Sequence, residues 1–171
     1  VITPPVGFEI DGPEHGSRIS TGVLDDLLAR AIVLESNGAR IVLVSLDVWG
    51  LSVQLIKSIT NAAAVAADVS TDSIWLTITG NGTSPPLWRN VDEYANYSKY
   101  LPEQIAGAVK VAIQSMEPAS MGSKGTSLPN VSTFKGGPGR PGNPALFVMA
   151  VNRSDGSGIA RIMNFACPAT I

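Results

Sequence analysis

Histidine and cysteine are almost absent from this chain of 171 residues, which contains one of each. A single cysteine, Cys167, excludes an internal disulfide, so the chain is not a disulfide-stapled scaffold. A single histidine, His15, lies in a polar turn, where a lone histidine is most often exposed rather than a metal ligand. Cys167 ends an apolar stretch with no second histidine to act as its base, and we interpret it as a small buried hydrophobe.

Charge is also scarce and balanced, with 12 Lys and Arg, 14 Asp and Glu, and a net charge of −2. The basic residues are scattered, which excludes the electrostatic footprint of a nucleic-acid-binding protein and a polybasic patch for anionic lipid. No stretch approaches the roughly 18 consecutive apolar residues of a membrane span. We therefore expect neither a nucleic-acid partner nor a membrane span.

No signal peptide is visible at the start of this sequence, because residues 1–5 (VITPP) have neither a basic start nor an apolar core. Either the chain is cytosolic or processing has removed its leader. Four matches to the N-glycosylation pattern favour secretion, and we expect an extracellular or cell-surface location. Coincidental spacing in polar loops is the alternative reading. The four candidate acceptors are Asn81, Asn96, Asn130 and Asn152.

Apolar residues make up 44% of the chain, which is a globular composition with enough residues for a real core. Residues 28–35 (LARAIVLE) and 39–48 (ARIVLVSLDV) predict two strands joined by a Ser-Asn-Gly turn into a hairpin. The second strand is apolar on both faces, so we expect it inside a covered sheet. Apolar spacing predicts a helix over residues 52–67, with Ser52 as its N-cap.

Further along the chain, residues 73–79 predict a strand and residues 102–116 a helix that Pro102 opens. A second hairpin is predicted from residues 145–151 and 159–166. Residues 1–21 and 122–144 are rich in glycine and proline and indicate irregular structure. The order of elements predicts an α/β fold in which helices cover a mixed β-sheet, as a single domain over residues 1–171.

An ordered set of short motifs resembles the neutral/alkaline non-lysosomal ceramidase family. The set spans nearly the whole chain, and it corresponds to about the first half of the family's catalytic domain. The motifs are residues 2–7 (ITPPVG), 28–34 (LARAIVL), 41–47 (IVLVSLD), 143–144 (NP), 155–156 (DG), 159–160 (IA) and 164–167 (NFAC). The resemblance implies a ceramidase-like domain and a zinc-dependent hydrolase ancestry that cleaves the amide bond of ceramide.

The resemblance also implies where two zinc-binding histidines would lie, and this sequence departs at both places. The stretch after the strand reads TGNGTSP, with Gly80 and Gly82 at the histidine positions, and the later stretch carries Pro168 at the other ligand position. Glycine and proline offer no side-chain donor, whereas catalytic zinc needs about three protein ligands. Asn130-Val131 stands where the family carries a substrate-polarising arginine. We therefore expect neither bound zinc nor zinc-dependent catalysis here.

Other reactive residues have plainer interpretations. Ser84 lacks the strand-turn-helix elbow of a hydrolase nucleophile, and Gly80-x-Gly82 lacks the rest of a phosphate-binding motif, so it predicts a turn with positive φ angles. Asp47 ends a buried strand and is expected to organise neighbouring loops. Trp75 fits a core position, whereas Trp88 is expected at the surface or an interface. Tyr94, Tyr97 and Tyr100 share one side of a helix and face either a partner or their own core.

The leading hypothesis is a non-catalytic extracellular ceramidase-like module, structural or self-assembling, with homo-oligomeric or other assembly partners and with glycans. An alternative is a fragment of an amide hydrolase whose remaining catalytic residues lie beyond Ile171. The third interpretation is a lipid- or glycan-binding module.

Overall fold

The structure is a computed structural model, which describes residues 1–11, 16–89, 95–129, 131 and 143–166. Contacts divide the chain into two compact units, one that contains Val1–Met116 and one of Glu117–Pro168. The single domain expected over residues 1–171 stays a prediction. Within the described residues, neither helix is long and apolar enough to cross a membrane.

The first predicted hairpin forms as β3 (Ala29–Ser36) and β4 (Ala39–Leu46), which pair antiparallel in register from Ala29↔Leu46 to Ser36↔Ala39. The turn between them consists of Asn37 and Gly38, whose φ angles are 51° and 79°. Two consecutive positive φ angles match the right-handed twist of the flanking strands, and Asn-Gly is the pair that adopts them most readily. The hairpin prediction is therefore confirmed, turn included.

A helical crossover leads from β4 to a third strand, β5 (Ile74–Ile78), which pairs parallel with β4. The crossover contains α1 (Val53–Ala67) and a short 3-10 turn at Thr71–Ser73. The Ser52 hydroxyl accepts a hydrogen bond from the backbone N–H of Leu55 at 3.3 Å, as predicted for an N-cap. One antiparallel and one parallel pairing make β3-β4-β5 a mixed sheet.

The second helix, α2 (Ala95–Gln114), begins before its predicted start, and Pro102 lies inside it. Proline normally interrupts a helix because it lacks an N–H and crowds the preceding turn. Burial outweighs that penalty here, since Tyr97, Leu101, Ile105 and Val109 recur every four residues and are all buried. The prediction that Pro102 opens the helix was wrong, because it weighed local propensity over the packed apolar stripe.

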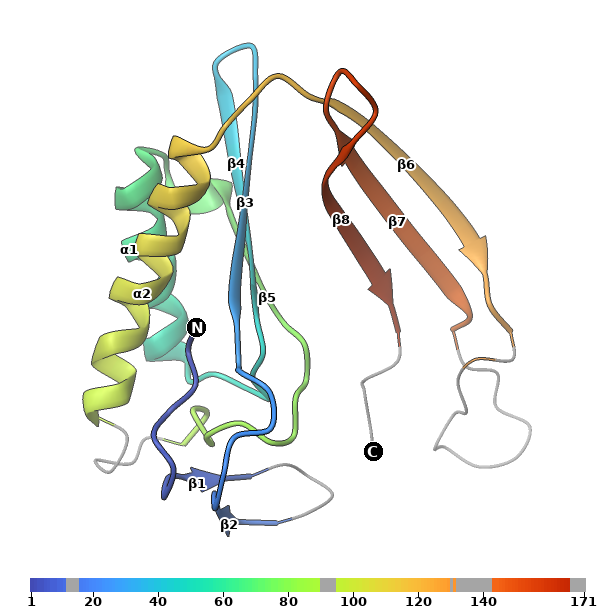
Figure 1. Cartoon of the computed structure of the whole chain (residues 1–171). Coiled ribbons are helices and arrows are strands. Elements are labelled where there is room, and N and C mark those ends of the chain that lie inside the picture. Colours follow the sequence, from blue (N-terminus) through green and yellow to red (C-terminus); the bar gives the residue numbers. More distant parts are fainter. Residues whose placement is uncertain (12–15, 90–94, 130, 132–142, 167–171) are drawn as a thin grey trace. The chain divides into compact units, whose positions relative to one another are not determined.

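Both helices lie on one face of the sheet, and the core fills the space between these two layers (Figure 1). On β4, alternate residues point to the helices, and Val42, Val44 and Leu46 are each at most 1% exposed. They pack with residues of both helices in one apolar cluster that includes Ile59 of α1. The α/β class, with a mixed sheet covered by helices, is confirmed.

The opposite face of this sheet is only partly covered in the described residues. Trp75, expected in the core, pairs with Leu43 on this face and is 57% exposed. Ile41, from the same face of β4, is 38% exposed. The core assignment of Trp75 was wrong because the alternation of β5 turns Ile74 and Leu76 toward the helices and Trp75 away from them.

The second unit consists of three antiparallel strands in the order β6-β7-β8. The predicted hairpin appears as β7 (Ala145–Asn152) and β8 (Gly158–Phe165). An additional strand, β6 (Ser120–Ser127), pairs with β7 inside the stretch expected to be irregular. All eight of its residues are exposed, so it is held by backbone pairing rather than by an apolar pattern that the sequence could reveal.

The glycine- and proline-rich lead-in also contains a small ladder. Its strands, β1 (Glu9–Ile10) and β2 (Arg18–Ile19), pair antiparallel over two residues each. The prediction of wholly irregular structure over residues 1–21 was wrong at these positions, because pairs this short leave no periodic signal.

Candidate functional site

The ends of β4 and β5 place two loops side by side in the first unit. Because the two strands are parallel, the segments that follow them leave the sheet at the same edge. The backbone N–H of Thr79 donates to the carbonyl of Leu46 at 3.0 Å, and that of Gly80 donates to Val48 at 3.1 Å. The loop with the predicted degenerate zinc positions is therefore fixed against the loop that follows β4.

Ser84 joins the two loops from inside. Ser84 is fully buried, and its hydroxyl accepts a hydrogen bond from the backbone N–H of Trp49 at 2.9 Å. Its carbonyl accepts from the backbone N–H of Asp11 at 3.1 Å, which attaches the lead-in to the same point. A buried hydroxyl engaged in this way holds the two loops together.

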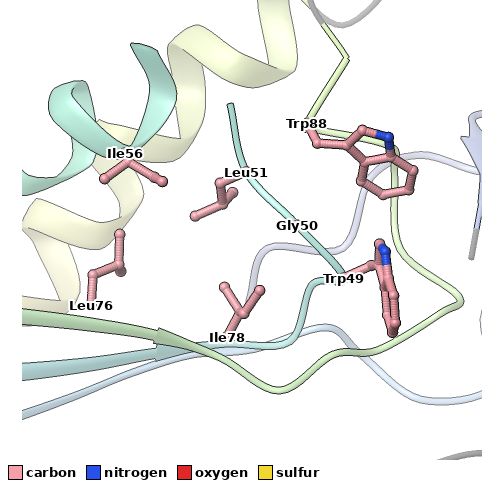
Figure 2. Close-up of a pocket in the computed structure, with 7 residues that line it drawn as sticks. All are labelled: Trp49, Gly50, Leu51, Ile56, Leu76, Ile78 and Trp88. Carbon is pink, nitrogen blue, oxygen red and sulfur yellow. The ribbon is translucent and has the colours of Figure 1, made fainter. Parts of the chain in front are cut away.

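An apolar pocket of about 450 Å³ opens where these loops meet α1 and β5 (Figure 2). Figure 2 shows Trp49 and Trp88 at one end of the pocket and Ile56 and Leu76 at the other. The lining contains no charged side chain and consists of Trp49, Gly50, Leu51, Ile56, Leu76, Ile78 and Trp88. Such a lining offers a guest apolar and aromatic surface and no charged partner.

One wall of the pocket is fixed by a charged network. The Arg89 guanidinium binds the Glu9 carboxylate at 3.0 Å and also pairs closely with Asp11. Its Cζ atom lies 5.7 Å from the centroid of the neighbouring Trp88 ring, within cation–π range. Sequence reasoning missed this network, because nothing in their spacing connects Arg89 to two acids about 80 residues earlier in the chain.

Asp47 organises the start of β3, as predicted from its place after a buried strand. Its carboxylate accepts hydrogen bonds from the backbone N–H of Leu28 at 3.1 Å and from the Arg30 guanidinium at 3.1 and 3.2 Å. Its own N–H donates to the Leu28 carbonyl at 3.0 Å. These contacts give Asp47 a positioning role within the sheet edge.

Gly80 and Gly82, which the motif resemblance aligns with zinc-binding histidines, carry no donor side chain. Gly80 has a φ angle of 75°, a conformation that residues other than glycine adopt at a cost. In the described part of the chain, no group of three or more His, Cys, Asp or Glu side chains could hold a metal ion. Gly82 lies in the same loop, whereas Pro168 and both His15 and Cys167 fall outside the described residues. The absence of zinc therefore stays a prediction.

The predicted aromatic and sequon residues divide into several groups. Tyr97 is 7% exposed, and its hydroxyl donates a hydrogen bond to the Ile2 carbonyl, so it packs in its own unit and the interface interpretation was wrong for it. Tyr100 is 48% exposed and Trp88 is half-buried in the pocket wall. Tyr94 and Asn130 lie outside the described residues. The predicted correspondence of Asn130 with the family's arginine site therefore stays a prediction.

This chain is similar to known proteins in its structure rather than in its sequence. No protein-family model matches the sequence, and no curated protein matches it either. Among solved structures, neutral ceramidase from Pseudomonas aeruginosa matches with a TM-score of 0.77 at 16% sequence identity. This match covers 95% of the present chain and 30% of the ceramidase chain.

This chain has a ceramidase-like fold. A second structure, of ceramidase complexed with C2, matches with a TM-score of 0.70 at 17% identity, over 95% of this chain and 29% of the other. The resemblance inferred from short motifs is thus confirmed as a structural likeness. The chain spans about 30% of the length of the ceramidases that it matches.

Proposed function

We propose that this chain is a non-catalytic ceramidase-like module with a structural role outside the cell. The feature that carries the proposal is the loop after β5, where the motif resemblance aligns Gly80 and Gly82 with the family's zinc-binding histidines. The positive φ angle of Gly80 supports it further, because the backbone has a shape suited to glycine rather than to a ligand side chain. Zinc held by backbone alone would lack the donors that a catalytic site needs.

The test measures metal and activity on one preparation. The purified full chain is analysed for zinc by mass spectrometry and then incubated with an N-acyl sphingosine analogue, with a chelator-treated aliquot as the control. We expect no stoichiometric zinc and no hydrolysis above the chelated control. One zinc per chain together with chelator-sensitive hydrolysis would overturn the proposal and favour the hydrolase-fragment alternative.

Self-association is the structural role that the surface supports. Trp75 and Ile41 expose apolar area on the same sheet face, and tryptophan is enriched at protein interfaces. We therefore propose a homo-oligomer, to be tested by light scattering coupled to size exclusion. Trp75→Asp should lower the measured mass, whereas Val65→Asp, at an 84% exposed helix position, should leave it unchanged. A monomeric mass for the unmodified chain at all concentrations would remove this role.

The apolar pocket supports a second candidate function, the binding of an alkyl chain without chemistry. The apolar lining, which contains no charged side chain, suits an alkyl chain. A fluorescent fatty-acid analogue should bind the full chain, and Trp88→Ala should weaken that binding several-fold. Trp75→Ala, which removes an indole away from the pocket, is the matched control and should bind as the unmodified chain does. Equal binding by both variants would argue against the pocket.

A further inference from the structure

The loop after β5 holds Asn81 in a conformation that leaves one particular atom available. The Asn81 Oδ1 atom accepts two hydrogen bonds from Thr83, one from the backbone N–H at 2.9 Å and one from the hydroxyl at 2.7 Å. Both bonds use the amide oxygen. The Nδ2 atom donates no hydrogen bond within the described part of the chain, and Nδ2 is the atom to which an N-linked glycan attaches.

Asn152 provides an internal comparison, because it carries the same sequence pattern in a different setting. It lies within β7 and pairs with Ser120 of β6 and Gly158 of β8. Its Oδ1 atom is buried and has no hydrogen-bond partner in the described residues. Because the amide oxygen is buried, this carboxamide packs against its surroundings, whereas the Asn81 amide lies in a loop, so the native fold has less room for a sugar at Asn152.

We propose that Asn81 carries an N-linked glycan and that Asn152 does not. The donor is a lipid-linked oligosaccharide pyrophosphate. The bond between sugar C1 and the pyrophosphate oxygen breaks, the bond between C1 and Nδ2 forms, Nδ2 loses one proton, and the lipid pyrophosphate leaves. The proposal rests on the extracellular location proposed above, because this donor is met on the secretory route.

Transfer takes place on an unfolded segment, so the folded geometry bears on whether the native fold can accommodate the attached sugar. At Asn81 the two bonds from Thr83 use only the oxygen, and the glycosylated amide still accepts both of them. The flanking Gly80 and Gly82 add no side chain that would crowd the first sugar. The loop that lacks zinc donors is thus suited to a glycan.

The position gives the glycan a physical consequence for the candidate site. Asn81 follows Ile78, a residue of the pocket lining, by three positions along the chain. A hydrated oligosaccharide on this loop stands at the edge where β4 and β5 end. It would hinder a macromolecular or membrane-bound substrate from approaching this edge, which agrees with a module that has no catalytic task.

Glycopeptide mapping of the full chain, secreted from a eukaryotic cell, tests the proposal directly. Release by peptide N-glycosidase in heavy-oxygen water converts each occupied asparagine into a labelled aspartate. We expect the label at Asn81 and not at Asn152. A secreted chain with unlabelled Asn81, or with labelled Asn152, overturns the proposal.

Variants at Thr83 and Asn152 separate the effect of the glycosylation pattern from that of the loop conformation. Thr83→Ser keeps the hydroxyl and the sequon and should retain the glycan, whereas Thr83→Val keeps the side-chain shape and should lose one glycan from the intact mass. Asn152→Gln should leave the mass of the attached glycans unchanged. Zinc content and hydrolysis are measured on the same material. Protein that is unglycosylated, zinc-free and inactive would overturn only the proposal of a glycan at Asn81. Zinc-dependent hydrolysis would overturn the proposed function.

Discussion

The indole of Trp88 lies directly against the backbone of Gly50. A Cβ atom added at Gly50 would be 3.3 Å from Cε3 of Trp88 and 3.6 Å from its Cβ. The first of these distances is tighter than an ordinary carbon–carbon contact, so any larger residue at this position must move the indole or the loop. Gly50 therefore sets how closely the loop after β5, which carries Trp88, approaches the loop after β4.

Gly50→Ala should consequently displace the Trp88 ring and destabilise the fold by about 1 kcal/mol, the lower end of the range for overpacking. Near-ultraviolet circular dichroism reports the displacement, and denaturant unfolding reports the stability. Gly107→Ala is the matched control, because a Cβ at that helical glycine meets nothing within 4 Å. It should stabilise the protein by about 0.5–1 kcal/mol. The same sign for both substitutions would show that the Trp88 contact does not limit this position.

Gly80→Ala tests whether the loop after β5 depends on a left-handed glycine. With φ at 75°, a side chain at Gly80 meets a penalty of about 1–2 kcal/mol. Gly82 is not among the residues with positive φ, so Gly82→Ala in the same loop should change stability less. Thermal unfolding of both variants gives the comparison. Equal melting temperatures would contradict a loop shaped around Gly80.

The Arg89 network should contribute more stability than the ion pair between Arg30 and Asp47. The Asp11 side chain is 7% exposed, whereas that of Asp47 is 17% exposed, so removal of Arg89 leaves the more deeply buried carboxylate without its partner. Arg89→Met should destabilise by about 1–3 kcal/mol, the range for an unsatisfied buried polar group. Arg30→Met, whose arginine is 57% exposed, should lose less than about 1 kcal/mol. Urea unfolding midpoints decide the order.

Local sequence patterns predicted the elements that carry their own signal. The Asn37-Gly38 turn, the Ser52 cap and the apolar strand β4 each depend on neighbouring residues, and each appears where it was expected, although only one face of β4 is fully buried. The ceramidase-like fold also followed from short motifs, although the structural match has only 16% identity. These features were readable because a turn, a cap or a buried face constrains the residue types at fixed spacings.

The failures share a different cause, which is dependence on distant residues. α2 passes through Pro102 because of packing against the sheet, and β6 forms only because β7 is available to pair with it. The pocket and the Arg89 network join segments from the lead-in, the loop after β4 and the loop after β5. No local period encodes such a meeting, so sequence reasoning singled out the loop after β5 but not the pocket and the ion pairs around it.

Tyr97 should make stability depend on alkaline pH. Its ring is buried against Phe8, with centroids 5.9 Å apart, and its hydroxyl donates to the Ile2 carbonyl. Burial, and secondarily the charge of Tyr100, raises the pKa of Tyr97 well above its ordinary value. In the unfolded chain this phenol titrates near pH 10, with a pKa of about 10.

The sign follows from proton binding. Below the unfolded pKa both states hold the proton, and the stabilising contribution of Tyr97 is fully present. Above it the unfolded chain loses the proton while the folded chain keeps it, so stability falls as pH rises, by up to about 1.4 kcal/mol per pH unit.

Urea unfolding between pH 8 and pH 11 should show this decline in the unmodified chain. Tyr97→Phe should flatten it and lose about 1 kcal/mol at neutral pH with the hydrogen bond. Tyr100→Phe, at a position 48% exposed on the same helix, should keep most of the decline. An unchanged slope in Tyr97→Phe would assign the alkaline sensitivity to other groups.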